Sequence, residues 1–287
     1  MKVVIFAGGF GTRLSEETSI RPKPMVEIGG RPILWHVMKI FSRYGLTDFV
    51  VLGGYKVEFI REYFLNFNRM SRDFTIDLAS DKIVWSRGAA EPWRVTVLDT
   101  GLETMTGGRL KRAAAIIGNE TFCLTYGDGV SNINIKELIE FHHRSGRWAT
   151  VTAVPAPGRF GVLVLSEDGG NVRTFREKDS RDAALINGGF FVCEPKVFDL
   201  VDDDSTVWEL APMEKLVHNG QLAAYRHFGF WQNMDTLRDK AILESAWTAG
   251  APWLKSEVES APGEQFSDRV SRRGDRPASF RGLAIRR

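Results

Sequence analysis

Short apolar runs alternate with longer amphipathic segments along the first half of this 287-residue chain. The apolar runs fit buried strands, and the longer segments fit helices. The expected strands cover residues 2–7, 48–53, 121–126 and 149–154. The expected helices cover residues 31–44, 57–66 and 135–145. This order predicts an α/β fold with a Rossmann-like, mostly parallel sheet and helices on both faces, in which ligands bind beyond the carboxyl ends of the strands.

The pattern changes after about residue 155. Segments 160–165, 172–177 and 185–193 are rich in β-forming residues and are separated by polar runs. They predict a smaller, β-rich part in which hairpins form a wall beside the sheet. Residues 234–248 then predict a closing helix.

A glycine-rich stretch from Gly8 to Arg13 directly follows the first expected strand. Glycines at positions 8, 9 and 11 let backbone N–H groups approach an anion without interference from a Cβ atom. From the glycines alone, a phosphate-binding loop and an ordinary turn fit equally well. Lys23 favours phosphate binding, because Pro22 and Pro24 fix the backbone on both sides of this cation.

For four other residues, the local sequence fits a structural role. Asp128 stands between two glycines at the end of an expected strand, where a carboxylate fits either Mg²⁺ binding or a β-turn. Asp235 precedes an expected helix, where its structural alternative is an N-cap. Arg109 lies in a basic run that most often faces water, and Trp231 fits a buried core position.

Positive charge is concentrated at the C-terminal end of the chain. The net charge is +2. Residues 255–287 carry Lys255 and seven arginines against five acidic residues, so they contribute +3 and leave −1 for residues 1–254. A nearly neutral body does not favour nucleic acid as a partner, and the Arg- and Ser-rich end predicts a flexible basic tail.

The hydrophobic residues indicate a protein that is not inserted in a membrane. No apolar run approaches the roughly 20 residues needed to span a bilayer, and the N-terminus lacks signal-peptide features. We therefore expect a cytoplasmic protein with no membrane partner. Cys123 and Cys193 lie in apolar, strand-like runs, which predicts a packing role for both.

Several motifs resemble the nucleotidyltransferase family that makes sugar nucleotides. They are residues 8–25, residues 27–34 and residues 126–129. The segments that resemble the cytidylyl branch of this family are residues 91–93, 97–101, 105–112 and 230–240. The resemblance runs from residue 1 to about residue 253. It implies an Mg²⁺-dependent enzyme that transfers a cytidylyl group from CTP to α-D-glucose 1-phosphate, giving CDP-glucose and pyrophosphate by in-line attack on the α-phosphate.

The resemblance also implies roles for individual residues. The residues expected to bind the nucleotide are Phe6, Ala7, Gly8, Gly9, Phe10, Gly11, Thr12, Arg13, Lys23, Thr104, Arg109 and Asp128. Those expected to bind the sugar phosphate are Glu177, Lys178, Asn187, Gly188 and Trp231. The expected Mg²⁺ ligands are Asp128 and Asp235, and the expected catalytic residues are Arg13, Lys23, Asp128, Lys178 and Asp235. The family usually has proline after the lysine of its Glu-Lys pair, whereas Asp179 follows Lys178 here.

The same resemblance implies the organisation of the chain. We expect one nucleotidyltransferase domain over residues 1–254, with a nucleotide-binding half at about 1–154 and a sugar-phosphate-binding part at about 155–254. The flexible tail then covers residues 255–287. Relatives are oligomeric, and segment 66–90 holds aromatic residues with no place in the core pattern, so we expect a homo-oligomer. In relatives, CDP-glucose supplies deoxysugar synthesis, typically for surface polysaccharide.

Three alternatives for the function stay open. The first is the same reaction with UTP, dTTP, GTP or another sugar 1-phosphate, because the phosphate-binding parts are shared. The second is a glycosyltransferase, which usually carries an Asp-x-Asp motif, whereas Gly129 and Val130 follow Asp128 here. The third is a non-catalytic sensor that binds sugar nucleotides without releasing pyrophosphate.

Overall fold

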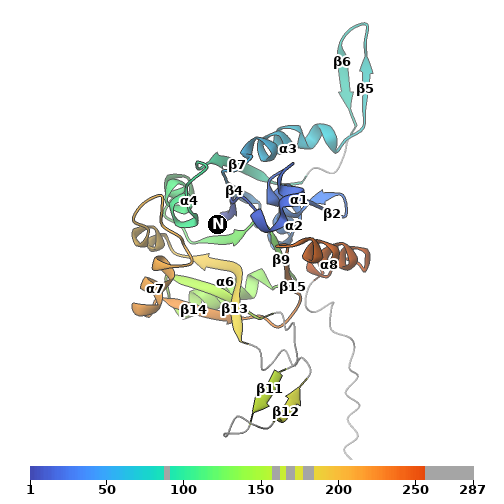
Figure 1. The fold of residues 1–287 in the computed structure, drawn as a ribbon. Helices are drawn as coiled ribbons and strands as arrows, with labels where there is room; N and C mark the ends of the chain where they lie inside the picture. The colour runs from blue at the N-terminus through green and yellow to red at the C-terminus, as the bar shows by residue number, and fades with distance from the viewer. Residues whose placement is uncertain (87–90, 157–161, 166–171, 177–183, 256–287) are drawn as a thin grey trace, which may run out of the picture.

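The computed structural model describes residues 1–86, 91–156, 162–165, 172–176 and 184–255. A seven-stranded sheet crosses the body in the order β14-β10-β13-β8-β1-β4-β7 (Figure 1). Its strands are β1 (Val3–Ala7), β4 (Asp48–Gly53), β7 (Arg94–Asp99), β8 (Phe122–Tyr126), β10 (Ala149–Pro155), β13 (Leu185–Cys193) and β14 (Leu222–Arg226). All run in one direction except β13, which is antiparallel to both of its neighbours. The prediction of a mostly parallel sheet is confirmed.

Both faces of this sheet are apolar. Successive side chains of a strand point to opposite faces. In β1, Val3 and Ile5 belong to one buried hydrophobic cluster, whereas Val4 and Phe6 belong to the other. A sheet of this kind needs a cover on each side, because either face would otherwise expose apolar surface to water.

Helices provide that cover. On the face that contains Ile5 lie α2 (Ile33–Ser42), α3 (Val57–Met70), α6 (Ile135–Ser145) and α8 (Leu237–Thr248). On the face that contains Phe6 lie α4 (Thr106–Arg112), α5 (Ala114–Ile117) and α7 (Ala211–His218). The predicted three-layer arrangement is therefore confirmed. Within the described ranges, no helix is both long enough and apolar enough to cross a bilayer.

Short elements connect these layers. They are η1 (Thr12–Leu14), α1 (Ser15–Thr18), η2 (Lys23–Met25), β2 (Glu27–Ile28), β3 (Arg31–Pro32), β9 (Gly129–Ser131), η3 (Pro195–Leu200), β15 (Trp231–Asn233) and η4 (Pro252–Leu254). Among them, β15 pairs with β9 and brings two distant parts of the chain together near the end of β8.

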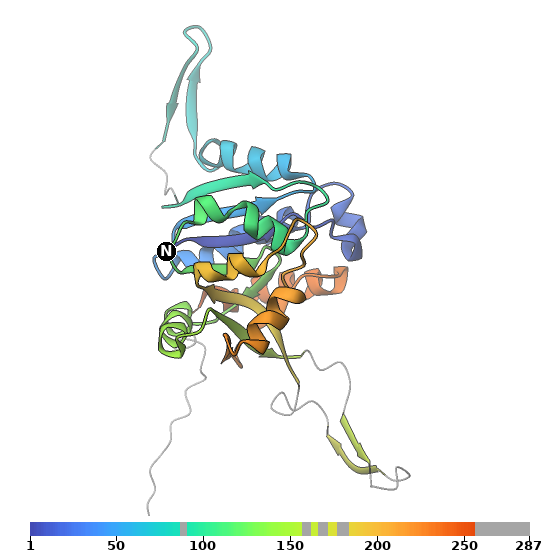
Figure 2. The ribbon, with the colours of Figure 1, turned by 90° about the vertical axis from the view of Figure 1, so that its left-hand side faces the viewer.

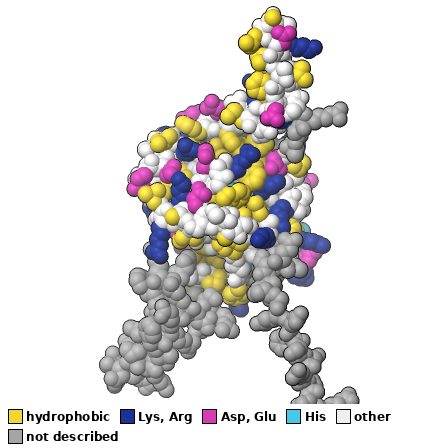
Figure 3. Space-filling model, turned by 90° about the vertical axis from the view of Figure 1, so that its right-hand side faces the viewer, with side chains coloured by type: hydrophobic (Ala, Val, Ile, Leu, Met, Phe, Trp, Pro, Cys, Tyr) yellow, Lys and Arg dark blue, Asp and Glu magenta, His cyan; other side chains and the backbone are white. Residues whose placement is uncertain are grey.

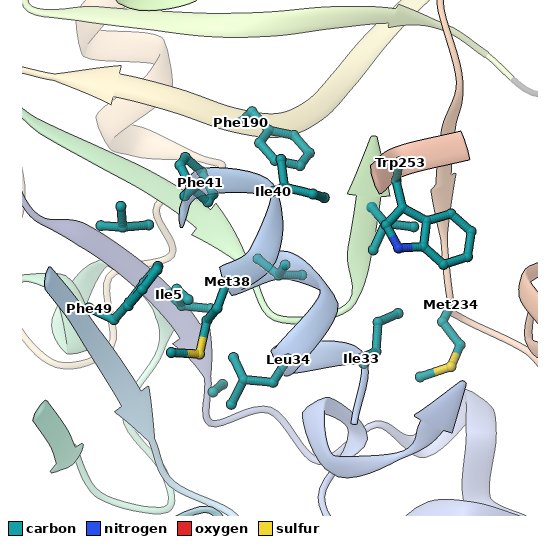
Figure 4. Close-up of a cluster of buried hydrophobic side chains, with 14 of the residues drawn as sticks. Ile5, Ile33, Leu34, Met38, Ile40, Phe41, Phe49, Phe190, Met234 and Trp253 are labelled. Carbon is teal, nitrogen blue, oxygen red and sulfur yellow. The ribbon is translucent and has the colours of Figure 1, made fainter. Parts of the chain in front are cut away.

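Helix α2 packs its apolar side onto the sheet. Leu34, Met38 and Phe41 are fully buried in the same cluster as Ile5 and Phe49, and Figure 4 shows them between helix and strands. This contact fixes the end of β1, from which the glycine-rich loop departs.

His36, in α2, is hydrogen-bonded to Ile28 and to Trp253, which lies close to the last residue that the structure describes. Its Nε2 donates to the carbonyl oxygen of Ile28 at 2.9 Å, and its Nδ1 accepts from Nε1 of Trp253 at 3.3 Å. Because an indole N–H can only donate, the imidazole is neutral and carries its proton on Nε2. Burial lowers the pKa of His36 to about 4. Trp253 is itself buried, so the chain around residue 253 belongs to the core.

Two hairpins project from the body in opposite directions (Figures 1 and 2). One pairs β5 (Phe74–Asp77) with β6 (Lys82–Trp85), and the other pairs β11 (Val162–Leu165) with β12 (Val172–Arg176). The β5–β6 hairpin is exposed, and Figure 3 shows hydrophobic side chains along it. Its exposed hydrophobic residues are Phe74, Ile76, Leu78, Ile83, Val84 and Trp85.

Two details differ from the sequence-based expectations. Residues 185–193 form an inner strand of the main sheet, not part of a hairpin wall, because β13 pairs with both β8 and β10. The closing helix begins at Leu237, not at residue 234, because Thr236 caps it. The Oγ1 of Thr236 accepts from the N–H of Asp239, and the Asp239 carboxylate accepts from the N–H of Thr236.

Candidate active site

The glycine-rich loop leaves the carboxyl end of β1 and is held by bonds to its own carbonyl groups. The N–H of Leu14 donates to the carbonyl oxygen of Gly11 at 2.9 Å. The hydroxyl of Thr18 donates to the same oxygen at 3.1 Å. The loop therefore has a defined shape at the sheet edge where the sequence predicts ligand binding.

Arg109 fixes the loop from the opposite side. Its guanidinium group is buried and lies so close to Gly8 that a Cβ atom there would be 2.3 Å from Nη1. The acceptors of its hydrogen bonds, at 2.7 to 3.2 Å, are the carbonyl oxygens of Gly8, Gly53, Gly101 and Leu102 and the hydroxyl of Thr100. Burial lowers the pKa of Arg109. The alternative of a water-facing Arg109 is therefore wrong.

A cavity of about 340 Å³ lies between this loop, the start of α4 and the end of β8. The residues that the sequence assigns to nucleotide binding all line it: Phe6, Ala7, Gly8, Gly9, Phe10, Gly11, Thr12, Arg13, Lys23, Thr104, Arg109 and Asp128. They come from separate segments of the chain, and the fold brings them to one edge of the sheet. We refer to this space as the first cavity.

Lys23 lies between two carboxylates at this edge. Its Nζ is 2.5 Å from Oδ2 of Asp128 and 2.5 Å from Oδ1 of Asp235. Nη1 of Arg13 is 2.9 Å from Oδ2 of Asp235. Burial of the lysine lowers its pKa, but the two carboxylates outweigh that effect, so the net result is a raised pKa for Lys23. The ammonium group is therefore charged at neutral pH.

The two carboxylates converge on one cation position, and the pairing of β9 with β15 explains why. Gly129 lies opposite Asn233 in this pair, and the N–H of Met234 donates to the carbonyl oxygen of Asp128 at 2.9 Å. Asp128 and Asp235 therefore meet although they are far apart in sequence. Two carboxylates together with phosphate oxygens and water fit Mg²⁺. The part of the chain that the structure describes has no cluster of three or more His, Cys, Asp or Glu side chains suited to a metal.

A second cavity of about 330 Å³ adjoins the first. It is lined by three of the residues expected to bind the sugar phosphate, namely Asn187, Gly188 and Trp231, and by Asp235. The two cavities share Arg13, Tyr126 and Asp128. Glu177 and Lys178, which the sequence also assigns to this side, lie outside the described residues.

Trp231 and Asp235 differ from their structural alternatives. Trp231 is only partly buried, and its Nε1 donates to the carbonyl oxygen of Gly188 at 2.8 Å. It therefore borders the second cavity and packs against the edge of the core without being fully buried in it. Asp235 does not cap α8, because Thr236 occupies the N-cap position.

Sequence reasoning assigned no role to Tyr126 and overlooked Glu209. The Tyr126 hydroxyl lies 2.6 Å from Oε1 of Glu209. Tyr126 directly precedes the Gly-Asp-Gly stretch, which was a usable signal for its position at the site. Glu209 follows Trp208 in an irregular segment before α7, and nothing in its local sequence indicates that it reaches the second cavity.

Comparison with known proteins identifies the class of this fold and site. The nucleotidyl transferase family matches residues 2–239, and the chain belongs to that family. Over 255 residues it is 53% identical to the glucose-1-phosphate cytidylyltransferase of Salmonella typhi. The matched region covers 88% of this chain and 98% of that protein.

One further relative and one solved structure are similar to the chain. The chain is 47% identical over 251 residues to the probable glucose-1-phosphate cytidylyltransferase of Bacillus subtilis (strain 168), covering 87% of this chain and 97% of that protein. The crystal structure of HddC from Yersinia pseudotuberculosis shares the fold, with a TM-score of 0.64, 23% identity, and coverage of 86% of this chain and 99% of that one.

Proposed function

We propose that the protein transfers a cytidylyl group from CTP to α-D-glucose 1-phosphate and releases pyrophosphate. The observation that carries the proposal is the pair of adjoining cavities that share Arg13, Tyr126 and Asp128. One cavity is bordered by a glycine-rich loop suited to a triphosphate, and the other by polar groups suited to a sugar. The 53% and 47% identities to the Salmonella and Bacillus proteins support CTP and glucose 1-phosphate as substrates.

The proposed chemistry requires no covalent intermediate. The phosphate oxygen of the sugar already carries negative charge, so the enzyme must align it with the α-phosphorus and neutralise the triphosphate. The two cavities perform the alignment, and Arg13 and Lys23 supply positive charge. Mg²⁺, held by Asp128 and Asp235, would neutralise further charge at the α-phosphate. On this proposal, Lys23 leaves the two carboxylates and turns towards the phosphates when the substrates enter.

The remaining residues have supporting roles in this proposal. Backbone N–H groups of the glycine-rich loop bind phosphate oxygens, and Thr104 contacts the nucleotide from the other side of the first cavity. Arg109 acts on the nucleotide by holding the carbonyl group of Gly8. On the acceptor side, Lys178 binds the sugar phosphate, and Glu177, Asn187, Gly188 and Trp231 bind the sugar.

The test of this function is a measurement of pyrophosphate release with Mg²⁺ and glucose 1-phosphate. CTP, UTP, dTTP, ATP and GTP are compared side by side. We expect a strong preference for CTP. Preference for another nucleotide would leave the reaction type unchanged but assign a different base to the donor. Absence of pyrophosphate release with all five nucleotides would exclude the proposed substrate pair.

We further propose that the protein is a cytoplasmic homo-oligomer with one catalytic domain over residues 1–254. The exposed hydrophobic side chains of the β5–β6 hairpin support self-association, because isolated hairpins rarely expose so much apolar surface to water. Size-exclusion chromatography with light scattering tests this point. A monomer at micromolar concentration would contradict it.

A further inference from the structure

A chain of side-chain hydrogen bonds crosses the boundary between the two cavities. Nδ2 of Asn187 donates to the Tyr126 hydroxyl oxygen at 3.3 Å, and that hydroxyl donates to Oε1 of Glu209 at 2.6 Å. The Thr106 hydroxyl donates to Oε2 of Glu209 at 2.7 Å. The Glu209 carboxylate thus joins β8 to the first residue of α4, and Tyr126 extends the connection to β13.

The side chains that make up this series of hydrogen bonds have little freedom to move. Oδ1 of Asn187 accepts from the N–H of Gly189 at 2.8 Å, which fixes the orientation of the amide. The Tyr126 ring lies against Gly189, where a Cβ atom would be 2.6 Å from a ring carbon. Burial raises the pKa of Tyr126, and Glu209 raises it further, so the hydroxyl stays protonated and acts as the hydrogen-bond donor to Glu209.

Glu209 retains unused capacity to accept hydrogen bonds. A carboxylate has about four acceptor positions, and each oxygen of Glu209 accepts one of the two bonds described above. The side chain is partly buried and lines the second cavity. A hydroxyl group in that cavity can therefore donate to Glu209 without displacing Tyr126 or Thr106.

We propose that Glu209 determines which sugar the second cavity accepts. It positions Tyr126 and, through Tyr126, the amide of Asn187, and it accepts a hydrogen bond from a hydroxyl of the sugar phosphate. This inference rests on the proposed function, because it specifies how the same site recognises its acceptor.

A donor and an acceptor held at a fixed separation select for stereochemistry. A sugar hydroxyl can donate to Glu209 and accept from the second N–H of Asn187 only if it points between them. An epimer whose hydroxyl points elsewhere forfeits both hydrogen bonds, and the loss is larger at Glu209, which is partly buried, than at the exposed amide of Asn187. The bond from the Thr106 hydroxyl holds the other oxygen of Glu209 and so helps to fix the orientation of the carboxylate.

The test compares wild type with E209Q and Y126F in the pyrophosphate-release assay, with glucose 1-phosphate or galactose 1-phosphate as acceptor. Glutamine keeps the size of Glu209 but has one acceptor oxygen for the two donating hydroxyls. We expect E209Q to raise KM for glucose 1-phosphate about tenfold, with KM for CTP changed by less than about twofold. The preference for glucose 1-phosphate over galactose 1-phosphate, measured as the ratio of kcat/KM values, should fall about tenfold.

Two comparisons separate positioning from a general structural effect. Y126F should change the same parameters. The double variant should have nearly the same effect as E209Q alone, because both residues belong to one series of hydrogen bonds. The matched control is E214Q, which makes the same charge change at an exposed position of α7 and should behave as wild type. If E209Q does not fold, Y126F decides the question by the same parameters.

The outcomes distinguish this inference from the proposed function. A wild-type protein that releases no pyrophosphate with CTP and either sugar phosphate would refute the proposed function. An active wild type whose sugar preference is unchanged in E209Q and Y126F would refute the role of Glu209 alone. Equal increases of KM for CTP and for glucose 1-phosphate would also refute it, because they indicate a general disturbance of the site.

Discussion

Nζ of Lys23 lies 2.5 Å from Oδ2 of Asp128. The same ammonium group is 2.5 Å from Oδ1 of Asp235, so one protein cation bridges both carboxylates. A divalent ion bound between Asp128 and Asp235 would compete for this position. The arrangement therefore links metal binding to the position of the Lys23 ammonium group.

Removal of one carboxylate should abolish most of the activity. We expect D128N to lower kcat by more than about 100-fold, because it removes charge that would hold the metal at the α-phosphate. The measurement is pyrophosphate release at saturating Mg²⁺. The control is D199N, at an exposed position of η3, which should retain full activity. Wild-type turnover in D128N would show that Asp128 binds no catalytic metal.

Removal of the bridging cation should make the protein dependent on divalent ions for stability. In K23M, two partly buried carboxylates lose the cation that lies between them, although Arg13 still pairs with Asp235. We expect this loss to lower the free energy of unfolding by about 3 kcal/mol in EDTA. Mg²⁺ should then raise the Tm of K23M more than that of wild type. Equal Tm shifts in the two proteins would contradict competition between Lys23 and the metal for one position.

Arg109 should tolerate no conservative replacement. Lysine has three donors, so R109K leaves some of the carbonyl oxygens around the guanidinium group without partners. We expect a loss of about 2 to 3 kcal/mol in the free energy of unfolding, measured in urea, and a higher KM for CTP. R112K is the matched control, because Arg112 is exposed on the same helix, and it should be much less affected. A similar loss in both variants would argue against the buried role of Arg109.

His36 should make the protein less stable in mild acid. Its pKa is about 4 in the folded protein, against 6.5 for an ordinary histidine. Between these values the unfolded chain binds more protons than the folded one, so the free energy of unfolding falls as the pH falls from 6.5 to 4. The shift corresponds to about 3 kcal/mol.

The measurement is urea unfolding of wild type and H36Q across this pH range. H36Q should lose stability less steeply than wild type, whatever its stability at pH 7. H218Q, at an exposed position of α7, serves as the control and should follow wild type. Parallel curves for wild type and H36Q would exclude His36 as the titrating group.

The local parts of the site could be predicted from sequence because neighbouring residues determine them. The glycines after β1 and the prolines around Lys23 act over a few residues, and the first cavity is lined as expected. The surroundings of Arg109 could not be predicted, because its acceptors come from distant turns. The contact of Glu209 with Tyr126 likewise joins segments 83 residues apart.

The alternation of strands and helices was predicted, but the direction of β13 was not. Its apolar sequence fits a parallel or an antiparallel inner strand equally well. Pairing with β8 and β10 decides the direction, and such pairing depends on contacts far along the chain. The position of Asp235 depends on the pairing of β15 with β9 in the same way.

The antiparallel course of β13 has a consequence for the evolution of acceptor choice. Pro155, at the end of β10, lies opposite Leu185, at the start of β13, so residues 156–184 leave and re-enter the sheet at adjacent points. This insert carries Glu177 and Lys178. Because its two ends already meet in the sheet, its length and sequence can change at little entropic cost to the rest of the fold. If Glu177 and Lys178 bind the acceptor as proposed, exchange of this connection would change the choice of sugar phosphate and leave the nucleotide-binding body intact.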